Sequence, residues 1–259
     1  MNEIFDIFDE KITVMSIAEK FASCDINDTI EKVKNEFSNK NFDVIGVKKD
    51  EKIIGYVNFS DIKKEIKNEK CGKYLKKFEI DEIIPESFPL NKTFEKFKFN
   101  NEKKIERLFV LTSRGVTHII TKADFQKIIV RLYIFSLFTT LEMELTKFIK
   151  ETFSEDEIKQ KINPKSLREA EDRLNRKKEN NCDLSLVDEL NFSDKYNIAL
   201  KVEEDNPFKD FEKYFKKLQK LRNNIAHSKD LLDDLIFDEI IEITIETYDF
   251  INKLKRNNS

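Results

Sequence analysis

The chain has 259 residues, of which 37% are charged and 39% hydrophobic, and its formal net charge is -3. This length accommodates two ordinary domains, and a content of only four glycines and four prolines favours amphipathic helices over a loop-rich β architecture. Because both signs of charge are interspersed, the overall balance demands neither a nucleic acid nor an anionic membrane, and a basic patch must be sought locally.

The cysteines and the apolar windows bear on the compartment. Cys24, Cys71 and Cys182 lie far apart in the sequence and form no Cys-x-x-Cys pair, so they indicate neither a disulfide framework nor a zinc knuckle, and a reducing cytosol fits best. The first residues do not resemble a secretory signal. The most apolar window, 128–141, contains Arg131 and is shorter than the roughly 20 residues of a membrane span. We therefore expect a cytoplasmic protein with no membrane partner.

An internal repeat organises the first half of the chain. Residues 42–62 and 105–125 each show the pattern of a strand, a turn, a second strand and the start of a helix. The superposition that places Asp61 on Asp124 also aligns two pairs of strand residues, Val47 with Val110 and Val57 with Ile120. Short amphipathic helices are predicted upstream, at 29–34 and 93–98. Each unit is too small to be stable alone, so two units are expected to share a core.

This layout resembles the paired CBS (cystathionine-β-synthase) domain, over about residues 8–68 and 71–127. The most specific feature is a Ser/Thr-x-x-Asp pattern between the second strand and the helix. The second repeat has Thr121 and Asp124 in this pattern, whereas the first has Asn58 in the hydroxyl position and retains Asp61.

The resemblance implies a regulatory adenosine nucleotide, namely ATP, ADP, AMP or a cyclic form. The carboxylates of Asp61 and Asp124 suit ribose hydroxyls, while the hydroxyl of Thr121 and helix N-terminal amides suit a phosphate. Asn58 completes the set of candidate ligand-binding residues. The alternative is that both aspartates only cap the helices that follow them. For His118, in the second strand of its repeat, a structural role is the expectation.

After Asp124 the apolar pattern becomes helical throughout. The predicted helices lie at 125–153, 167–178, 184–201 and 207–226, and a last helix runs from near Asp230 to about Lys255. Ser154 begins a capping pattern for a further short helix. The first of these helices is expected to continue from the repeat pair into the second domain and to couple the two.

The helix at 207–226 separates apolar from basic residues. Its apolar side contains Phe211, Tyr214, Phe215, Leu218, Leu221 and Ile225, and its basic side contains Lys209, Lys213, Lys216, Lys217 and Lys220. Clustered lysines release counterions from a phosphate backbone, so Lys213, Lys217 and Lys220 are candidate RNA contacts. The alternative is a lysine face that only keeps the protein soluble.

The end of this helix, Leu221 to His227, resembles the Arg-x(4-6)-His motif of HEPN ribonucleases, with polar Asn223 directly after Arg222. The chain is therefore expected to be an α+β protein. Paired CBS-type α/β repeats at 1–127 would precede an all-α, HEPN-like helical bundle at 128–259. The resemblance also implies a homodimer, an RNA substrate and a role in prokaryotic defence or toxicity.

On a continuous helix Arg222 and His227 would project about 140° apart and could not share one substrate. Either the helix ends before His227, or the site is completed across a dimer interface, as the resemblance implies.

The corresponding activity is a metal-independent endoribonuclease that leaves a 2',3'-cyclic phosphate. His227 would act as general acid or base, Arg222 would stabilise the phosphate charge, and Asn223 would orient the phosphate or His227. No metal-ligand cluster is visible in the sequence. The alternative is a non-catalytic, nucleotide-responsive regulatory or scaffold protein that dimerises through its helical domain, with Arg222 and Asn223 satisfying carbonyls and His227 capping the helix.

Overall fold

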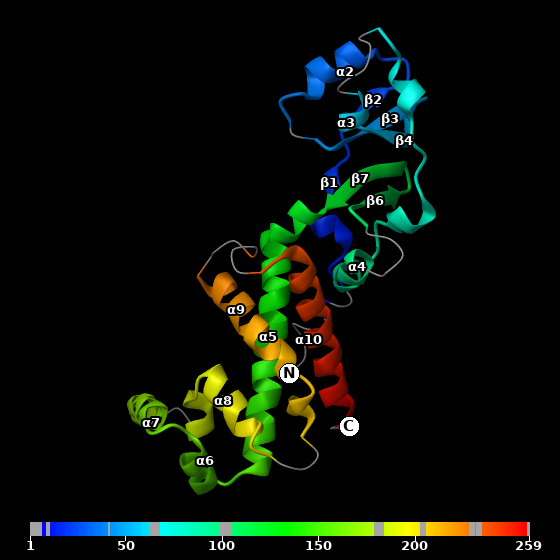
Figure 1. The fold of residues 1–259 in the computed structure, drawn as a ribbon. Helices are drawn as coiled ribbons and strands as arrows, with labels where there is room; N and C mark the ends of the chain where they lie inside the picture. Colours follow the sequence, from blue (N-terminus) through cyan, green and yellow to red (C-terminus); the bar gives the residue numbers. More distant parts are fainter. Residues whose placement is uncertain are drawn as a thin grey trace. The chain divides into compact units, whose positions relative to one another are not determined.

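The computed structural model separates into two compact units, Met1–Arg131 and Leu132–Ser259 (Figure 1). It describes residues 7–8, 11–40, 42–62, 68–98, 105–178, 184–202, 206–227, 231 and 235–257.

The first unit contains two small sheets, one for each repeat. The sheet of the first repeat has the order β2 (Ser23–Asp25), β3 (Val44–Lys49), β4 (Lys52–Asn58). The sheet of the second repeat has the order β1 (Glu19–Lys20), β7 (Gly115–Thr121), β6 (Arg107–Thr112), β5 (Ile83–Pro85). The predicted hairpins are β3–β4 and β6–β7, and both are antiparallel. The short strands β2 and β5 were not predicted, and each pairs in parallel with the first strand of its hairpin.

A helix connects the short strand to the hairpin in each repeat. In the first repeat, α2 (Ile30–Phe37) begins where the Thr29 hydroxyl accepts a hydrogen bond from the Lys32 amide at 3.3 Å, and it buries one apolar face. In the second repeat, α4 (Leu90–Phe97) likewise buries Leu90, Phe94 and Phe97. Both predicted helices are confirmed, although α4 begins three residues earlier than the sequence pattern indicated.

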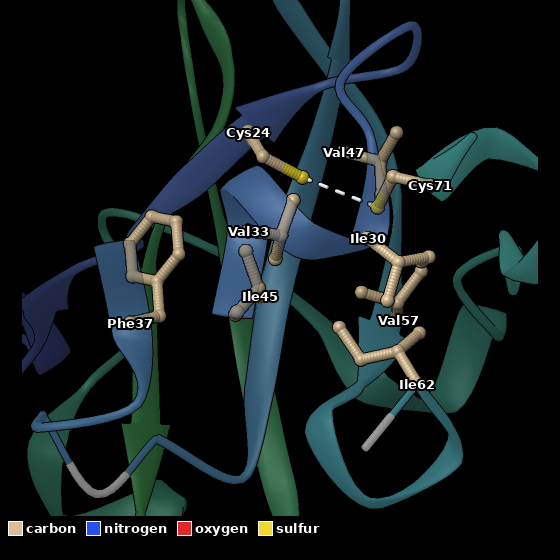
Figure 2. Packing of buried hydrophobic residues seen from close by; sticks show 9 residues of the cluster. All are labelled: Cys24, Ile30, Val33, Phe37, Ile45, Val47, Val57, Ile62 and Cys71. Carbon is tan, nitrogen blue, oxygen red and sulfur yellow. Dashed lines mark hydrogen bonds between the residues drawn. The ribbon is translucent and has the colours of Figure 1, made fainter. Parts of the chain in front are cut away.

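Short helical segments follow each hairpin. The four-residue α3 (Phe59–Ile62) follows β4, and the 3-10 helix η4 (Lys122–Gln126) follows β7. Three further 3-10 segments are η1 (Val14–Ser16), η2 (Cys71–Tyr74) and η3 (Ile80–Glu82). The core of the first repeat is drawn in Figure 2, and it consists of Cys24, Ile30, Val33, Phe37, Ile45, Val47, Val57, Ile62 and Cys71.

The two repeats share a second apolar cluster, as the small size of each required. Phe21, Val44, Tyr56, Phe109 and Val116 are its buried members. The Phe109 ring lies 5.1 Å from the Tyr56 ring and 5.3 Å from the Phe21 ring, between centroids. Burial of such rings contributes most of the stabilisation between repeats of this size.

The second unit is helical within its described residues. Its helices are α5 (Ile128–Thr152), α6 (Glu155–Lys161), α7 (Pro164–Lys178), α8 (Phe192–Ala199), α9 (Glu212–Ala226) and α10 (Phe237–Asn257), with 3-10 segments η5 (Leu186–Glu189) and η6 (Pro207–Lys209). The first turn of α5 belongs to the first unit. Among the described helices, none has the length and apolarity needed to cross a membrane.

Most of the predicted helices are present, with different bounds. The pattern at 184–201 forms two segments, η5 and α8, and the pattern at 207–226 forms η6 and α9. The last helix begins at Phe237, and the predicted start near Asp230 lies outside the described residues. The Ser154 capping box is confirmed, because the Ser154 amide donates to Glu157 Oε2 at 2.8 Å.

Aromatic packing fixes α9 in the second unit. The Phe215 ring stacks on the Tyr196 ring of α8 with centroids 3.6 Å apart, and it also stacks on Phe192 at 5.0 Å. These contacts place the N-terminal half of α9 against α8, and Phe192 in turn packs on Phe138 of α5 at 4.4 Å.

Candidate functional site

A cleft of about 510 Å³ opens in the first unit where β4 passes into α3. Its lining residues are Ser38, Phe42, Asp43, Asn58, Phe59, Ser60 and Arg107. All except Arg107 come from the first repeat. Arg107 is the first residue of β6, so both repeats contribute to the cleft.

A chain of polar side chains extends from Arg107 along one side of the cleft. Arg107 Nη1 donates to Asn58 Oδ1 at 3.3 Å, and Asn58 Nδ2 donates to Asp61 Oδ2 at 3.1 Å. Lys76 Nζ forms an ion pair with Asp61 Oδ2 at 2.7 Å. The Arg107 guanidinium also lies 5.7 Å from the centroid of the Tyr56 ring, which restricts its orientation.

The Lys76 ammonium holds the pKa of Asp61 below its ordinary value, because it donates a hydrogen bond to the carboxylate; the Asn58 amide and the Ser60 hydroxyl act in the same direction. Asp61 therefore stays ionised at neutral pH, and 40% of its side chain is exposed. The lining of the cleft thus combines a fixed cation, one carboxylate, an amide, two hydroxyls and two aromatic rings, and the ionised Asp61 lies next to it.

The equivalent position of the second repeat has a different arrangement. The Asp124 side chain is 7% exposed, and its Oδ2 accepts hydrogen bonds from the Thr121 amide at 2.7 Å and from the Thr121 hydroxyl at 3.0 Å. Its Oδ1 forms an ion pair with Lys127 Nζ at 2.9 Å. Both oxygens are therefore engaged within the protein, in the capping arrangement that the sequence left open as the alternative.

The structure does not bring the four predicted ligand residues together. Asn58 lines the cleft and donates a hydrogen bond to Asp61. Thr121 and Asp124 are not among the lining residues. Sequence reasoning missed Asp43, Ser60 and Arg107, which come from three separate segments. The available signal was the register of the repeats, in which Arg107 pairs with Thr121 as Val44 pairs with Asn58.

The Arg222-to-His227 motif lies at the C-terminal end of α9. The helix ends at Ala226, and the His227 amide, just beyond it, donates to the Asn223 carbonyl at 3.0 Å. The helix therefore ends before His227, which was one of the two alternatives. Asn223 and His227 are exposed, and the His227 ring has no hydrogen-bond partner among the described residues.

Arg222 projects toward the apolar side of α9, as its position on the helix predicts. Its guanidinium lies 5.4 Å from the centroid of the Phe138 ring, and its Nη1 donates to Asn223 Oδ1 at 3.2 Å. Its Nε is buried and has no hydrogen-bond partner within the described part of the chain. The same holds for Nδ2 of Asn224, a residue only 1% exposed that sequence reasoning did not single out. Such buried, unpartnered donors are rare in folded proteins.

The lysine face of α9 is partly neutralised. Lys217 Nζ forms an ion pair with Glu239 Oε1 of α10 at 2.9 Å, and Lys213 Nζ lies 4.5 Å from the centroid of the Tyr214 ring. Lys213 and Lys220 are exposed. Across the residues that are described, no group of three or more His, Cys, Asp or Glu side chains has the arrangement of a metal site.

Residues 13–68 match the family model of the CBS domain, so the first repeat is a CBS domain. A comparison with curated proteins found no match. This match does not extend into the helical unit, so the HEPN resemblance stays a prediction from the sequence motif alone.

Several solved structures resemble part of the chain. A hemolysin-like protein containing a CBS domain, from Oenococcus oeni PSU, is 18% identical, with 48% of this chain and 93% of that chain covered and a TM-score of 0.37. The CBS domains of a transcriptional regulator from Streptococcus pneumoniae are 13% identical, covering 44% and 96%, with a TM-score of 0.38. The CBS domain of a bacterial CNNM/CorC family Mg²⁺ transporter, in complex with ATP, is 13% identical, covering 47% and 89%, with a TM-score of 0.38.

Proposed function

We propose that the first unit binds an adenosine nucleotide in the cleft lined by Asn58 and Arg107, and that the bound nucleotide regulates the helical unit. The observation that carries this proposal is the hydrogen bond between Arg107 of the second repeat and Asn58 at the end of β4. It places a cation and an ionised carboxylate, Asp61, on one side of a cleft in a CBS domain.

The side chains divide into groups that suit the parts of a nucleotide. The planar guanidinium of Arg107 suits a phosphate, to which it can donate two parallel hydrogen bonds. The carboxylates of Asp43 and Asp61 suit ribose hydroxyls, and Phe42 and Phe59 offer apolar surface to a base. The engaged oxygens of Asp124 favour a structural role for the second repeat's pattern.

Titration calorimetry of the full-length protein with ATP, ADP, AMP and cyclic AMP tests the proposal. A hydrogen bond to a charged group contributes about 1.5–3 kcal/mol, so Arg107→Ala is expected to weaken binding by about 10- to 100-fold. The matched control is Arg114→Ala, which removes an exposed arginine from the β6–β7 turn and should leave affinity unchanged. Failure of all four nucleotides to bind the wild type, or equal affinity of Arg107→Ala, would contradict the proposal.

Regulation would pass through α5, whose first turn belongs to the first unit and whose remainder belongs to the second. A nucleotide can shift the state of the helical unit only if it binds two arrangements with different affinity. A change in hydrogen exchange along 128–152 on adding nucleotide is the expected observation, and an unchanged exchange pattern would argue against coupling.

The end of α9 supports a second candidate function, a metal-independent endoribonuclease acting as a homodimer. The supporting observation is the buried Arg222 Nε, which has no hydrogen-bond partner among the residues that are described, next to exposed Asn223 and His227. A phosphate would receive hydrogen bonds from Arg222, and Asn223 would orient it. His227 would transfer the proton as the 2'-hydroxyl attacks the adjacent phosphate.

Single-stranded RNA incubated with the wild type in the presence of chelator is expected to yield 2',3'-cyclic phosphate ends. His227→Ala should abolish cleavage, and His118→Ala is the matched control because it removes the chain's other histidine. Equal cleavage by the wild type and His227→Ala would exclude this mechanism. Nucleotide binding without RNA turnover would instead favour the regulatory or scaffold protein.

A further inference from the structure

Two cysteines that are far apart in the sequence meet in the core of the first repeat. Cys24 lies in β2 and Cys71 begins η2, and their Sγ atoms are 3.3 Å apart. Figure 2 shows the two sulfur atoms pointing toward each other across the apolar cluster. Both residues are free thiols. The sulfurs are thus in direct contact without being bonded.

The environment makes the two thiols unequal. The hydrogen bond from Cys24 lowers the pKa of the Cys71 thiol, because it stabilises the Cys71 thiolate. The same hydrogen bond, followed by burial, raises the pKa of the Cys24 thiol. The contact therefore supplies one sulfur that can react as a thiolate and, beside it, a second that can resolve the product.

Access to Cys71 depends on a single turn of backbone. Cys71 is itself fully buried, but Lys70 and Lys73 on either side of it are exposed. The Cys71 amide donates to the Asp28 carbonyl at 2.8 Å and the Gly72 amide donates to the Ile26 carbonyl at 3.0 Å. Local opening of a short segment generally costs less than global unfolding, and a small oxidant requires less opening than a bulky one.

We propose that Cys24 and Cys71 are an oxidation site, at which hydrogen peroxide or a peroxide of similar size converts the thiol pair to an intrachain disulfide. The Cys71 thiolate attacks one peroxide oxygen, which forms Cys71 sulfenic acid and releases hydroxide. The Cys24 sulfur then attacks the Cys71 sulfur, a disulfide forms, and the sulfenic oxygen leaves as water. In total two thiols and one hydrogen peroxide give one disulfide and two waters.

The disulfide would connect β2 to η2 and close the segment between them, which contains Asp43, Asn58 and Asp61. A crosslink across a segment of this length restricts the unfolded chain and so stabilises the folded repeat. Oxidation is therefore expected to raise the unfolding temperature of the first unit, and a thiol reductant should reverse the rise.

The test uses the full-length protein and its Cys182→Ser variant, which leaves only this pair. Each is treated with hydrogen peroxide, unfolded, and alkylated at its remaining thiols, and then mapped by non-reducing peptide mass spectrometry. The expected result for both is a peptide joining Cys24 to Cys71, which dithiothreitol separates. Alkylated Cys24 and Cys71, or their sulfinic and sulfonic acids in place of the joined peptide, would overturn the proposal.

A second measurement asks whether the fold is responsible. The Cys182→Ser variant is oxidised in parallel in buffer and in concentrated urea, under the same peroxide concentration and pH. If the packing of β2 against η2 brings the sulfurs together, the share of oxidised molecules that carry the Cys24–Cys71 disulfide, and not sulfinic or sulfonic acids, is at least several-fold larger in buffer. An equal or larger share in urea would overturn the proposal, because the native contact would then contribute nothing.

Discussion

The two repeats of the first unit share a backbone and differ in the chemistry placed on it. Both hairpins have the same register, and each is interrupted at the same place, after Val47 in one and after Val110 in the other. Yet Asn58 lines a cleft and donates a hydrogen bond to Asp61, whereas Thr121 and Asp124 are closed into a capping box. A repeated framework therefore does not imply a repeated binding site, and equivalent positions must be judged by their partners.

The shared core is equally asymmetric. The position that Phe109 occupies in the second repeat is Gly46 in the first, where an added Cβ would lie 3.1 Å from the Phe21 ring. The second repeat thus places the ring of Phe109 in the shared cluster at a position where the first repeat has no side chain. Likewise Gly55 stands where the second repeat has His118, because the linker after the first repeat passes directly over it.

The largest expected effect comes from removing the ring that fills the shared core. Phe109 is fully buried and packs on Phe21, Tyr56 and Phe78. Phe109→Ala should lower the unfolding free energy of the first unit by about 3–5 kcal/mol. Hydrogen exchange of the β6–β7 amides in the full-length protein measures this unit separately. Leu111→Ala, on the same strand but 45% exposed, is the control, and an equal loss in both variants would refute the asymmetry of the core.

A smaller loss is expected at Gly55. A Cβ there would lie 2.2 Å from the Lys76 carbonyl oxygen, so the linker must move and its two backbone hydrogen bonds with Tyr56, at 2.9 and 2.8 Å, must weaken. Gly55→Ala should cost about 1–3 kcal/mol, seen as faster exchange of the Tyr56 and Lys76 amides. His118→Ala changes the equivalent position of the second repeat and should leave these amides protected. Protection retained in Gly55→Ala would contradict the close approach.

The capping box of Thr121 and Asp124 can be compared directly with the equivalent pair in the first repeat, Asn58 and Asp61. Asp124→Ala removes two hydrogen bonds from Thr121 and one of the two carboxylates that pair with Lys127, the other being Glu19. This substitution should lower the unfolding free energy of the first unit by about 2 kcal/mol. Asp61→Ala should cost much less stability, because its ion pair with Lys76 is exposed to solvent, but should weaken nucleotide binding. If Asp124→Ala weakened binding while leaving stability intact, the roles assigned to the two aspartates would be reversed.

The sequence predicted those features that depend on residues close together in the chain. Alternation of apolar residues identified the hairpins, and the spacing of Asp61 and Asp124 identified the repeat. The strands β2 and β5 were missed because three residues are too few to show alternation. The cleft was only half predicted, since Arg107 reaches Asn58 from the other repeat.

The thiol pair shows the same limit more sharply. Cys24 and Cys71 are 47 positions apart in the chain, and no pattern in the sequence indicates that β2 and η2 are neighbours. At the end of α9 the sequence left two alternatives; the helix ends at Ala226, as the first requires, and a site completed across a dimer stays a prediction. Contacts between distant segments decide such questions, and they follow from packing rather than from residue spacing.

The smallest expected effect concerns the charge of Asp61 itself. Because the hydrogen bond from Lys76 lowers its pKa, Lys76→Met should raise that pKa toward the ordinary value of an aspartate, as measured by carboxyl-carbon NMR over a pH titration. A depressed folded-state pKa stabilises the repeat above the ordinary pKa, and this contribution is lost as the pH falls through the folded-state value. Lys122→Met is the matched control in the second repeat and should leave the titration of Asp61 unchanged. If Lys76→Met also leaves the pKa of Asp61 unchanged, the Asn58 amide and the Ser60 hydroxyl must lower it, and residues that line the cleft would then prepare the carboxylate for a ligand.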